Sequence, residues 1–147
     1  MFPKHDQFVE HMKNLGVGLD KPIVVYDNQK GDWASRGAYV IHTYGHHNVS
    51  ILNGGLKKWI SESRPIESGA GPEKNSATDF NFALISDRIK QFEEMHKIAI
   101  GELPPVQILD ARFSKLFSEG HIPTSKNIQY SDCIAADNTL KSVEDLR

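Results

Sequence analysis

Apolar residues in the first part of the chain alternate between helical spacing and short β-branched runs. Phe8, Met12 and Leu15 recur at helical spacing within residues 5–16, which predicts a short amphipathic helix. The β-branched run at residues 22–26 is typical of a strand that is buried on both faces. A helix, a strand and another helix are expected to follow, at residues 35–44, 49–52 and 56–61. This order predicts an α/β fold with a parallel sheet and right-handed crossovers.

Residues 64–79 break this alternation, because prolines and glycines stand there among small and polar residues. They predict a linker or a long loop. A new series follows, consisting of a helix, a strand, a helical turn and a short strand, at residues 86–98, 106–109, 113–118 and 127–130. Residues 142–147 begin with a capping-box pattern, so they predict the start of a helix that this chain does not complete.

Composition narrows the class of protein. With 147 residues, the chain is long enough for one ordinary domain and too short for two complete ones. Hydrophobic residues make up 39% and charged residues 24%, which is typical of a soluble globular protein. No segment approaches the ~20 apolar residues of a membrane span. The formal charge is -2 with both signs interspersed, which argues against a nucleic-acid-binding surface.

Cys133 is the single cysteine, so the sequence excludes an intramolecular disulfide and a zinc site with several cysteines. Asp132 stands beside it, and an adjacent carboxylate disfavours a thiolate. No glycine-rich anion-binding loop follows. We therefore interpret Cys133 as a structural cysteine, with a reactive thiol as the alternative.

Three histidines near residue 45 raise the question of a metal site: His42, His46 and His47. Adjacent histidines at a helix end point in different directions, and no nearby acid or cysteine completes a set of ligands. We therefore predict a solvated helix terminus, where imidazolium suits the helix dipole. No metal and no cofactor is expected.

Two stretches carry motifs in a fixed order. The first runs from Val25-Tyr26-Asp27 through Trp33-Ala34-Ser35-Arg36 to Gly45-His46 and residues 49–59, which include the tight turn at Gly54-Gly55. The second runs from Ile108-Leu109-Asp110-Ala111-Arg112 to Gly120-His121-Ile122-Pro123 and Asn127-Ile128. Together they resemble the tandem rhodanese family of thiosulfate sulfurtransferases.

The resemblance implies a particular organisation of the chain. Residues 1–66 resemble the C-terminal half of a first rhodanese-like module, residues 67–82 a linker, and residues 83–147 the N-terminal half of a second module. The implied fold is a rhodanese-like parallel sheet flanked by helices, present as two incomplete half-modules. One hypothesis joins the halves tail to head as a circularly permuted domain, within one chain or in a swapped homodimer.

Rhodanese chemistry, as the resemblance implies it, needs a cysteine thiolate after a central strand. The thiolate attacks the outer sulfur of thiosulfate, becomes a persulfide, and passes that sulfur to cyanide or to a thiol. Backbone N–H groups of a loop that leads into a helix stabilise the thiolate and receive the anion. In this sequence Asp27 occupies the expected nucleophile position, so no catalytic residue is assigned.

The loop that follows is expected to be degenerate, and its residues are Asp27, Asn28, Gln29, Lys30, Gly31, Asp32 and Trp33. Asp27 and Asp32 oppose binding of a sulfur oxyanion, and Lys30 offsets only part of that repulsion. A residual anion pocket is the alternative.

The second motif is interpreted as structural. Asp110 follows a strand, where its carboxylate can bind turn amides and pair with Arg112. The run Gly120-His121-Ile122-Pro123 predicts a turn that leads into a strand, because proline prevents a helix from continuing.

These observations favour a catalytically silent rhodanese module that acts through packing and protein contacts in a larger protein or complex. The alternative is part of an active sulfurtransferase whose cysteine loop comes from another segment or chain. A rhodanese-like phosphatase needs the same absent cysteine. The expected partner is a protein or the missing segments of a longer polypeptide, and the resemblance alone suggests the mitochondrion or the cytoplasm.

Overall fold

The computed structural model describes residues 2–71 and 79–146 of the chain. It divides into two compact units, Met1–Ser86 and Asp87–Arg147. The boundary lies a few residues beyond the end of the linker that the resemblance implies.

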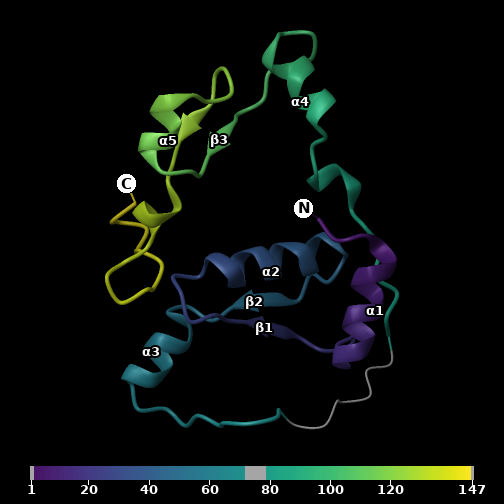
Figure 1. The fold of residues 1–147 in the computed structure, drawn as a ribbon, viewed down its shortest axis with the longest axis vertical. Helices are drawn as coiled ribbons and strands as arrows, with labels where there is room; N and C mark the ends of the chain where they lie inside the picture. Colours follow the sequence, from purple (N-terminus) through teal and green to yellow (C-terminus); the bar gives the residue numbers. More distant parts are fainter. Residues whose placement is uncertain (1, 72–78, 147) are drawn as a thin grey trace. The chain divides into compact units, whose positions relative to one another are not determined.

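The first unit is built around a short parallel sheet. Strands β1 (Ile23–Val25) and β2 (Val49–Ile51) pair in parallel, with Ile23 opposite Val49. Helix α2 (Asp32–Thr43) connects them and packs against both strands (Figure 1). Helix α3 (Gly55–Ser61) follows β2 after a tight turn. The predicted order of strand, helix, strand and helix is therefore present.

Helix α1 (His5–Leu15) supplies one side of the apolar core of the first unit. Phe8 and Met12, which are one turn apart, point inward and are buried. The Phe8 ring stacks on Tyr44, with 4.1 Å between ring centroids, and meets Phe82 edge to face at 5.1 Å. Such aromatic pairs stabilise a core beyond the area they bury.

Residues 79–85, which we call the strap, extend along the first unit. The N–H groups of Ala83 and Ile85 donate to the carbonyls of Tyr44 and Thr43, at 3.2 and 2.8 Å. The carbonyl of Asp79 accepts the N–H of Leu19 at 2.8 Å. The strap therefore belongs to the first unit, although it directly precedes the second unit in the chain.

The second unit consists of short elements. A turn of 3-10 helix, η1 (Ser86–Arg88), leads to helix α4 (Phe92–Ala99). Strand β3 (Leu109–Asp110) pairs in parallel with β4 (Lys126–Asn127), and helix α5 (Ser114–Glu119) connects them. A second 3-10 turn, η2 (Tyr130–Cys133), follows.

Several sequence predictions about elements need correction. The helix expected at residues 86–98 is divided, because Gln91 is extended and α4 begins only at Phe92. Helix α2 begins at Asp32, earlier than expected. Strand β1 is not buried on both faces: α2 covers one face, and Val24 on the other is 62% exposed. The strand expected at residues 106–109 is also open, since Leu109 is 64% exposed.

The strands of the described residues pair within each unit: β1 with β2, and β3 with β4, as two-stranded sheets. The permuted arrangement, within one chain or in a swapped homodimer, stays a prediction.

Candidate functional site

The segment after β1 is the expected position of a rhodanese nucleophile, and Asp27 fills it with a bound carboxylate. One carboxylate oxygen accepts the backbone N–H groups of Gln29 and Gly31, at 2.9 and 3.2 Å. The other accepts the N–H of Ala34 at 2.9 Å, in the first turn of α2. The N–H of Ala34 would otherwise lack a partner in the first turn of the helix, and those of Gln29 and Gly31 lie in the loop before it. The carboxylate therefore acts as the ligand of its own loop.

The ionisation of Asp27 reflects this arrangement. Burial by itself raises the pKa of the carboxyl, but the hydrogen bonds from Ala34, Gln29, Gly31 and Trp33 outweigh it. The pKa of Asp27 is consequently held below its ordinary value. The loop thus holds a stable negative charge.

The backbone of Asp27 is also held in place. Its carbonyl accepts the N–H of Leu56 at 2.9 Å. Gly55 lies so close that a Cβ atom built on it would stand 2.6 Å from that carbonyl oxygen. Gly54 and Gly55 have φ of 89° and 55°, so the expected left-handed turn is present.

The remaining residues of the loop lie at the surface. Asn28, Lys30 and Asp32 are exposed, and Trp33 is 69% exposed at the start of α2. The expected degeneracy of this loop as a catalytic site remains a prediction.

The three histidines do not all lie in solvent as predicted. His46 is only 1% exposed, and its Nε2 lies 2.8 Å from the carbonyl oxygen of Lys21. Gly45, with φ of 90°, turns the chain back after α2, which directs His46 toward the segment before β1. His42 and His47 face each other, with 3.3 Å between Nε2 and Nδ1.

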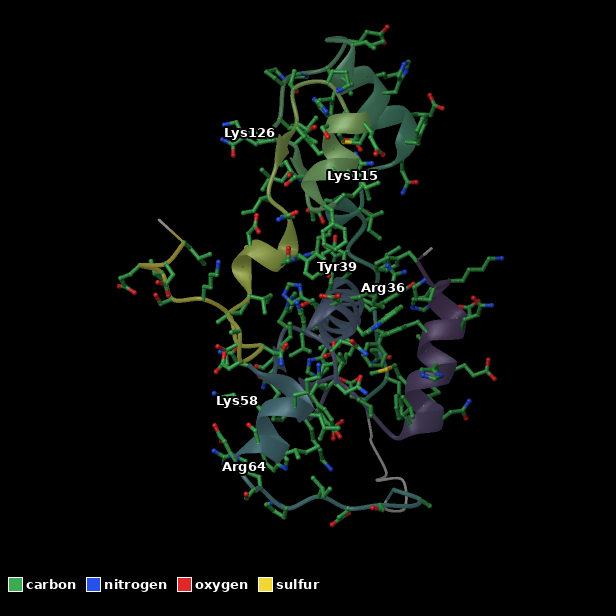
Figure 2. The ribbon with its side chains drawn as sticks, turned by 60° about the vertical axis from the view of Figure 1, so that its left-hand side comes forward. Arg36, Tyr39, Lys58, Arg64, Lys115 and Lys126 are labelled. Carbon is green, nitrogen blue, oxygen red and sulfur yellow. The ribbon has the colours of Figure 1, made fainter. Side chains whose placement is uncertain are left out.

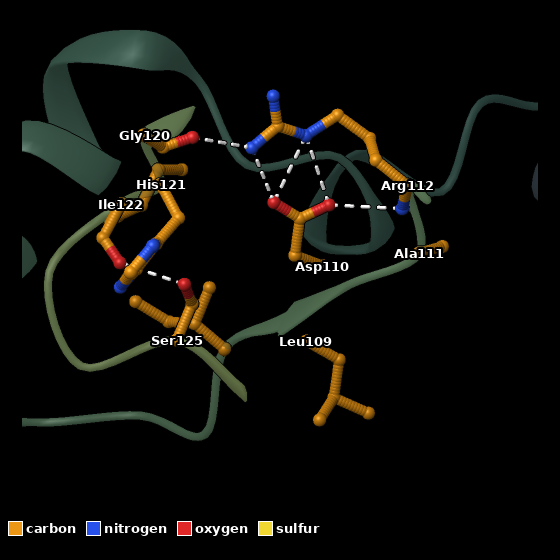
Figure 3. A pocket seen from close by; sticks show the side chains of 9 residues that line it. Leu109, Asp110, Ala111, Arg112, Gly120, His121, Ile122 and Ser125 are labelled. Atoms are coloured by element: carbon orange, nitrogen blue, oxygen red, sulfur yellow. Dashed lines mark hydrogen bonds and ion pairs between the residues drawn. The ribbon is translucent and has the colours of Figure 1, made fainter. Parts of the chain in front are cut away.

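The second predicted motif forms an ion pair in the second unit. Nε of Arg112 lies 3.0 and 2.9 Å from the two carboxylate oxygens of Asp110, and Nη2 lies 2.6 Å from one of them. Nη2 also donates to the carbonyl of Gly120 at 2.8 Å, and Figure 3 shows the guanidinium between these partners. The side-chain hydrogen bond from Arg112 lowers the pKa of Asp110, and its backbone N–H adds to the effect.

These residues line a hollow of about 540 Å³. Gly120, His121 and Ile122 form one side of it, and Pro123 follows in the turn. The His121 ring stacks on Phe117 at 3.8 Å between centroids, and its Nδ1 contacts the Phe117 carbonyl at 2.9 Å. The turn is therefore held by the ring as well as by Arg112.

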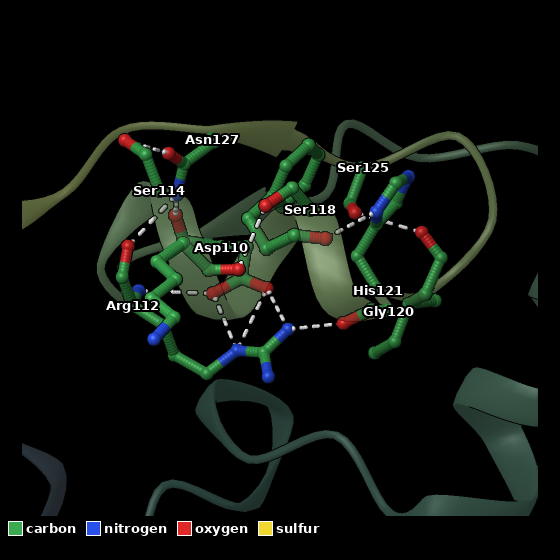
Figure 4. Close-up of polar contacts among 11 residues, drawn as sticks. Asp110, Arg112, Ser114, Ser118, Gly120, His121, Ser125 and Asn127 are labelled. Atoms are coloured by element: carbon green, nitrogen blue, oxygen red, sulfur yellow. Dashed lines mark hydrogen bonds and ion pairs between the residues drawn. The ribbon is translucent and has the colours of Figure 1, made fainter.

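A further set of polar side chains holds this corner. The sequence motif included Asn127, but it predicted no role for Asn127, Ser114 or Gln129. Nδ2 of Asn127 donates to the carbonyls of Asp110 and Arg112, both at 2.9 Å. Ser114 donates its hydroxyl to Asn127 and its N–H to Gln129, both at 3.0 Å (Figure 4). An asparagine within a short strand is a weak signal, because its partners lie far away in the sequence.

Basic side chains are spread over separate elements. Figure 2 labels Arg36 on α2, Lys58 on α3, Lys115 on α5 and Lys126 on β4. Near α3, Glu62 pairs with Arg64 at 2.7 Å and with Lys58 at 3.7 Å.

Residues 2–71 and 79–146 contain neither a grouped set of metal ligands nor a helix that could cross a membrane. In this part of the chain, no three histidine, cysteine, aspartate or glutamate side chains are grouped so that they could hold a metal ion. The helices of the same residues are too short or too polar to cross a bilayer.

The chain is similar in sequence and in structure to known proteins. Residues 2–62 match the rhodanese-like domain. The whole chain is 30% identical over 160 aligned residues to 3-mercaptopyruvate sulfurtransferase of Homo sapiens, of which it covers 52%. It is 29% identical to thiosulfate sulfurtransferase of Gallus gallus, of which it covers 53%. The crystal structure of SseA from Escherichia coli, a 3-mercaptopyruvate sulfotransferase, matches 99% of this chain with a TM-score of 0.86 and 29% identity, over 56% of that chain.

The parallel strands, the covering helices and these matches define an α/β protein with the rhodanese fold. Residues 2–62 belong to the rhodanese-like domain family, and the whole chain is similar to proteins named as sulfurtransferases. It spans about half the length of the curated relatives that it matches.

Proposed function

We propose that this chain is a rhodanese-family polypeptide without the persulfide-forming cysteine. It acts as a catalytically silent structural or interaction module of a larger protein or complex. The observation that carries this proposal is the Asp27 carboxylate, which binds the N–H groups of Gln29, Gly31 and Ala34.

Those N–H groups are the kind that an active loop offers to an anion. Here they bind a carboxylate that is covalently part of the loop and carries a pKa below its ordinary value. A thiosulfate dianion would have to displace this group and approach its charge. A carboxylate also cannot carry a transferable sulfur, so the site supports neither substrate binding nor group transfer.

The burial of the second unit supports a role in contacts with other polypeptide. Among its described residues, none is fully buried, and Phe92 is 82% exposed. Further large apolar side chains of this unit are exposed, among them Ile100, Leu109, Phe113 and Val143. A surface with many exposed apolar side chains is typical of one that another polypeptide covers. We infer that a protein partner, or further segments of a longer polypeptide, covers them.

A sulfurtransferase assay tests the proposal. We expect the chain to form no thiocyanate from thiosulfate and cyanide above a control without protein. The Cys133→Ser variant provides the matched comparison, because Cys133 is the only thiol. If the chain shows turnover and the Cys133→Ser variant does not, then Cys133 is the catalytic residue and the proposal is refuted.

The single variant Asp27→Cys extends the test. It places a thiol at the expected nucleophile position and frees three backbone N–H groups. We expect little turnover, because Asp32 keeps a negative charge beside the loop and Trp33 remains at its edge. Robust turnover by Asp27→Cys would show that the loop is less degenerate than we propose, and Asp27→Cys with Asp32→Asn measures the contribution of that charge.

The second candidate function is part of an active sulfurtransferase whose cysteine loop is supplied by another segment or chain. The names of the longer relatives, 3-mercaptopyruvate and thiosulfate sulfurtransferase, favour it. Intact mass of the natural protein, followed by mapping of persulfide sulfur to a peptide, distinguishes the two candidates. Persulfide on a cysteine outside these 147 residues would support the active enzyme.

A further inference from the structure

His5, the first residue of α1, connects that helix to the strap. Its Nε2 lies 2.8 Å from the carbonyl oxygen of Phe82, and its Nδ1 lies 3.1 Å from a carboxylate oxygen of Asp6. Carbonyl and carboxylate oxygens are both acceptors. Each ring nitrogen must therefore carry a hydrogen to make its bond, and only the imidazolium form has both.

We propose that His5 is a pH-dependent clasp, whose protonated ring holds the strap, residues 79–85, against α1 and whose deprotonation loosens it. A neutral ring has one N–H and can satisfy only one of the two oxygens. Loss of the proton therefore weakens the bond to Asp6 or the bond to Phe82, and it removes the charge from both.

The geometry of Phe82 makes its carbonyl a useful point of attachment. Its side chain is buried against Phe8, and its neighbour Ala83 donates an N–H to Tyr44. A bond at this carbonyl therefore restrains the part of the strap that enters the core. Because the strap directly precedes the second unit, the clasp acts on the attachment of the connecting segment to the first unit.

Among residues 2–71 and 79–146, Asp6 and Tyr44 are ionisable groups that face the His5 ring. On α1 it faces the exposed carboxylate of Asp6, and just after α2 it faces the Tyr44 ring, 6.0 Å away between centroids. Burial raises the pKa of Tyr44, and its hydroxyl donates to the Pro3 carbonyl at 2.6 Å, so this group stays neutral. The strap presents the Phe82 carbonyl, and its own carboxylate at Asp79 accepts the N–H of Asn81.

The direction of the pH effect follows from these contacts. The hydrogen bond to the Phe82 carbonyl, and then that to Asp6, raise the pKa of His5 above the ordinary value of 6.5. A group with a raised folded pKa contributes stability that is fully present below its unfolded pKa. For His5 this contribution is present below pH 6.5 and is lost as the pH rises through the higher folded pKa.

Two NMR measurements on the full chain test the proposal. The ring proton shifts of His5 give its pKa, and hydrogen exchange of the Ala83 and Ile85 amides gives strap protection after correction for the intrinsic pH dependence. We expect a pKa above 6.5. We expect protection to fall about two- to five-fold across the same transition, the range for an interaction of solvent-exposed charges.

The variants separate the clasp from general loosening. In His5→Gln, the amide can donate to the Phe82 carbonyl at every pH, so we expect strap protection that no longer depends on pH. Asp6→Asn should move the transition to lower pH, because it removes one of the two groups that favour the imidazolium. His11→Gln, on the same helix, should keep the wild-type profile.

Three results would overturn the proposal. They are a His5 pKa at or below 6.5, strap protection that is flat across the His5 titration, and the same pH-dependent loss in His5→Gln as in the wild-type chain.

Discussion

At the scale of single residues, Asp27 has the largest consequence for function. Its carboxylate accepts hydrogen bonds from the N–H groups of the loop and from Ala34 in the first turn of α2. The side chain therefore combines a structural role with the exclusion of an anion. Helix-capping groups of this kind stabilise proteins by about 0.5–2 kcal/mol.

Replacement of Asp27 by asparagine tests the structural part of this role. We expect Asp27→Asn to lower the free energy of unfolding by about 1 kcal/mol, because the amide is a weaker acceptor for several N–H groups. Asp32→Asn, in the same loop, should have a smaller effect. Because the pKa of Asp27 is lowered from 3.8, its contribution is present above that pH and is lost as the pH falls through the folded pKa. Urea unfolding of both variants, at neutral pH and at a pH well below 3.8, measures these free energies. If Asp27→Asn loses the same free energy at the two pH values, the charge of Asp27 is not the source of its contribution.

The pair Gly54-Gly55 gives a second prediction at the residue scale. Both have positive φ, and a Cβ on Gly55 would meet the Asp27 carbonyl at 2.6 Å. Replacement of both by alanine should reduce the free energy of unfolding by about 1–3 kcal/mol. Gly71→Ala is the control, since a Cβ there meets open space. An unchanged urea midpoint for the double variant would show that this turn does not require glycine at these two positions.

At the scale of elements, Asn127 of β4 connects its strand to the turn after β3. Its side-chain amide binds the carbonyls of Asp110 and Arg112. This contact holds the backbone from which the Arg112 guanidinium extends. The corner thus depends on pairing between the two strands as well as on the ion pair.

Asn127→Ala should loosen this corner selectively. Loss of two hydrogen bonds to backbone carbonyls is expected to lower the local opening free energy by about 1–2 kcal/mol. Hydrogen exchange of the Arg112 and Ile128 amides measures it, and the exposed Gln107→Ala provides a control in the same unit. Unchanged exchange in Asn127→Ala would show that the ion pair alone maintains the turn.

At the scale of the whole molecule, an exposed segment lies between α3 and the strap. Residues 62–71 are exposed throughout, whereas Phe82 is buried. Exposed polar segments are preferred sites of proteolysis. The strap, by contrast, is bound to α1, α2 and the segment before β1.

Cleavage by a glutamate-specific protease should therefore occur first after Glu67. We expect the two fragments to remain associated, because the strap stays packed in the core of the first unit. Phe82→Ala should release them, and Phe92→Ala, which changes an exposed ring, should not. Size-exclusion chromatography after cleavage measures the association, and separation of the wild-type fragments would refute this role of the strap.

Local pattern was sufficient for much of the first unit. The spacing of Phe8 and Met12 predicted α1, the β-branched run predicted β1, and Gly54-Gly55 predicted a left-handed turn. The ordered motifs also predicted the rhodanese family, which the comparisons support. Periodicity and backbone preference act over a few residues, so the sequence contains them directly.

Tertiary structure decided what those elements contact. The sequence placed Asp27 after β1, but only the path of the loop brings the N–H groups of Gln29 and Ala34 to its carboxylate. The burial of His46 depends on the turn after α2, and the bond between His5 and Phe82 spans 77 positions. Such contacts arise from packing between distant segments, which no local pattern specifies.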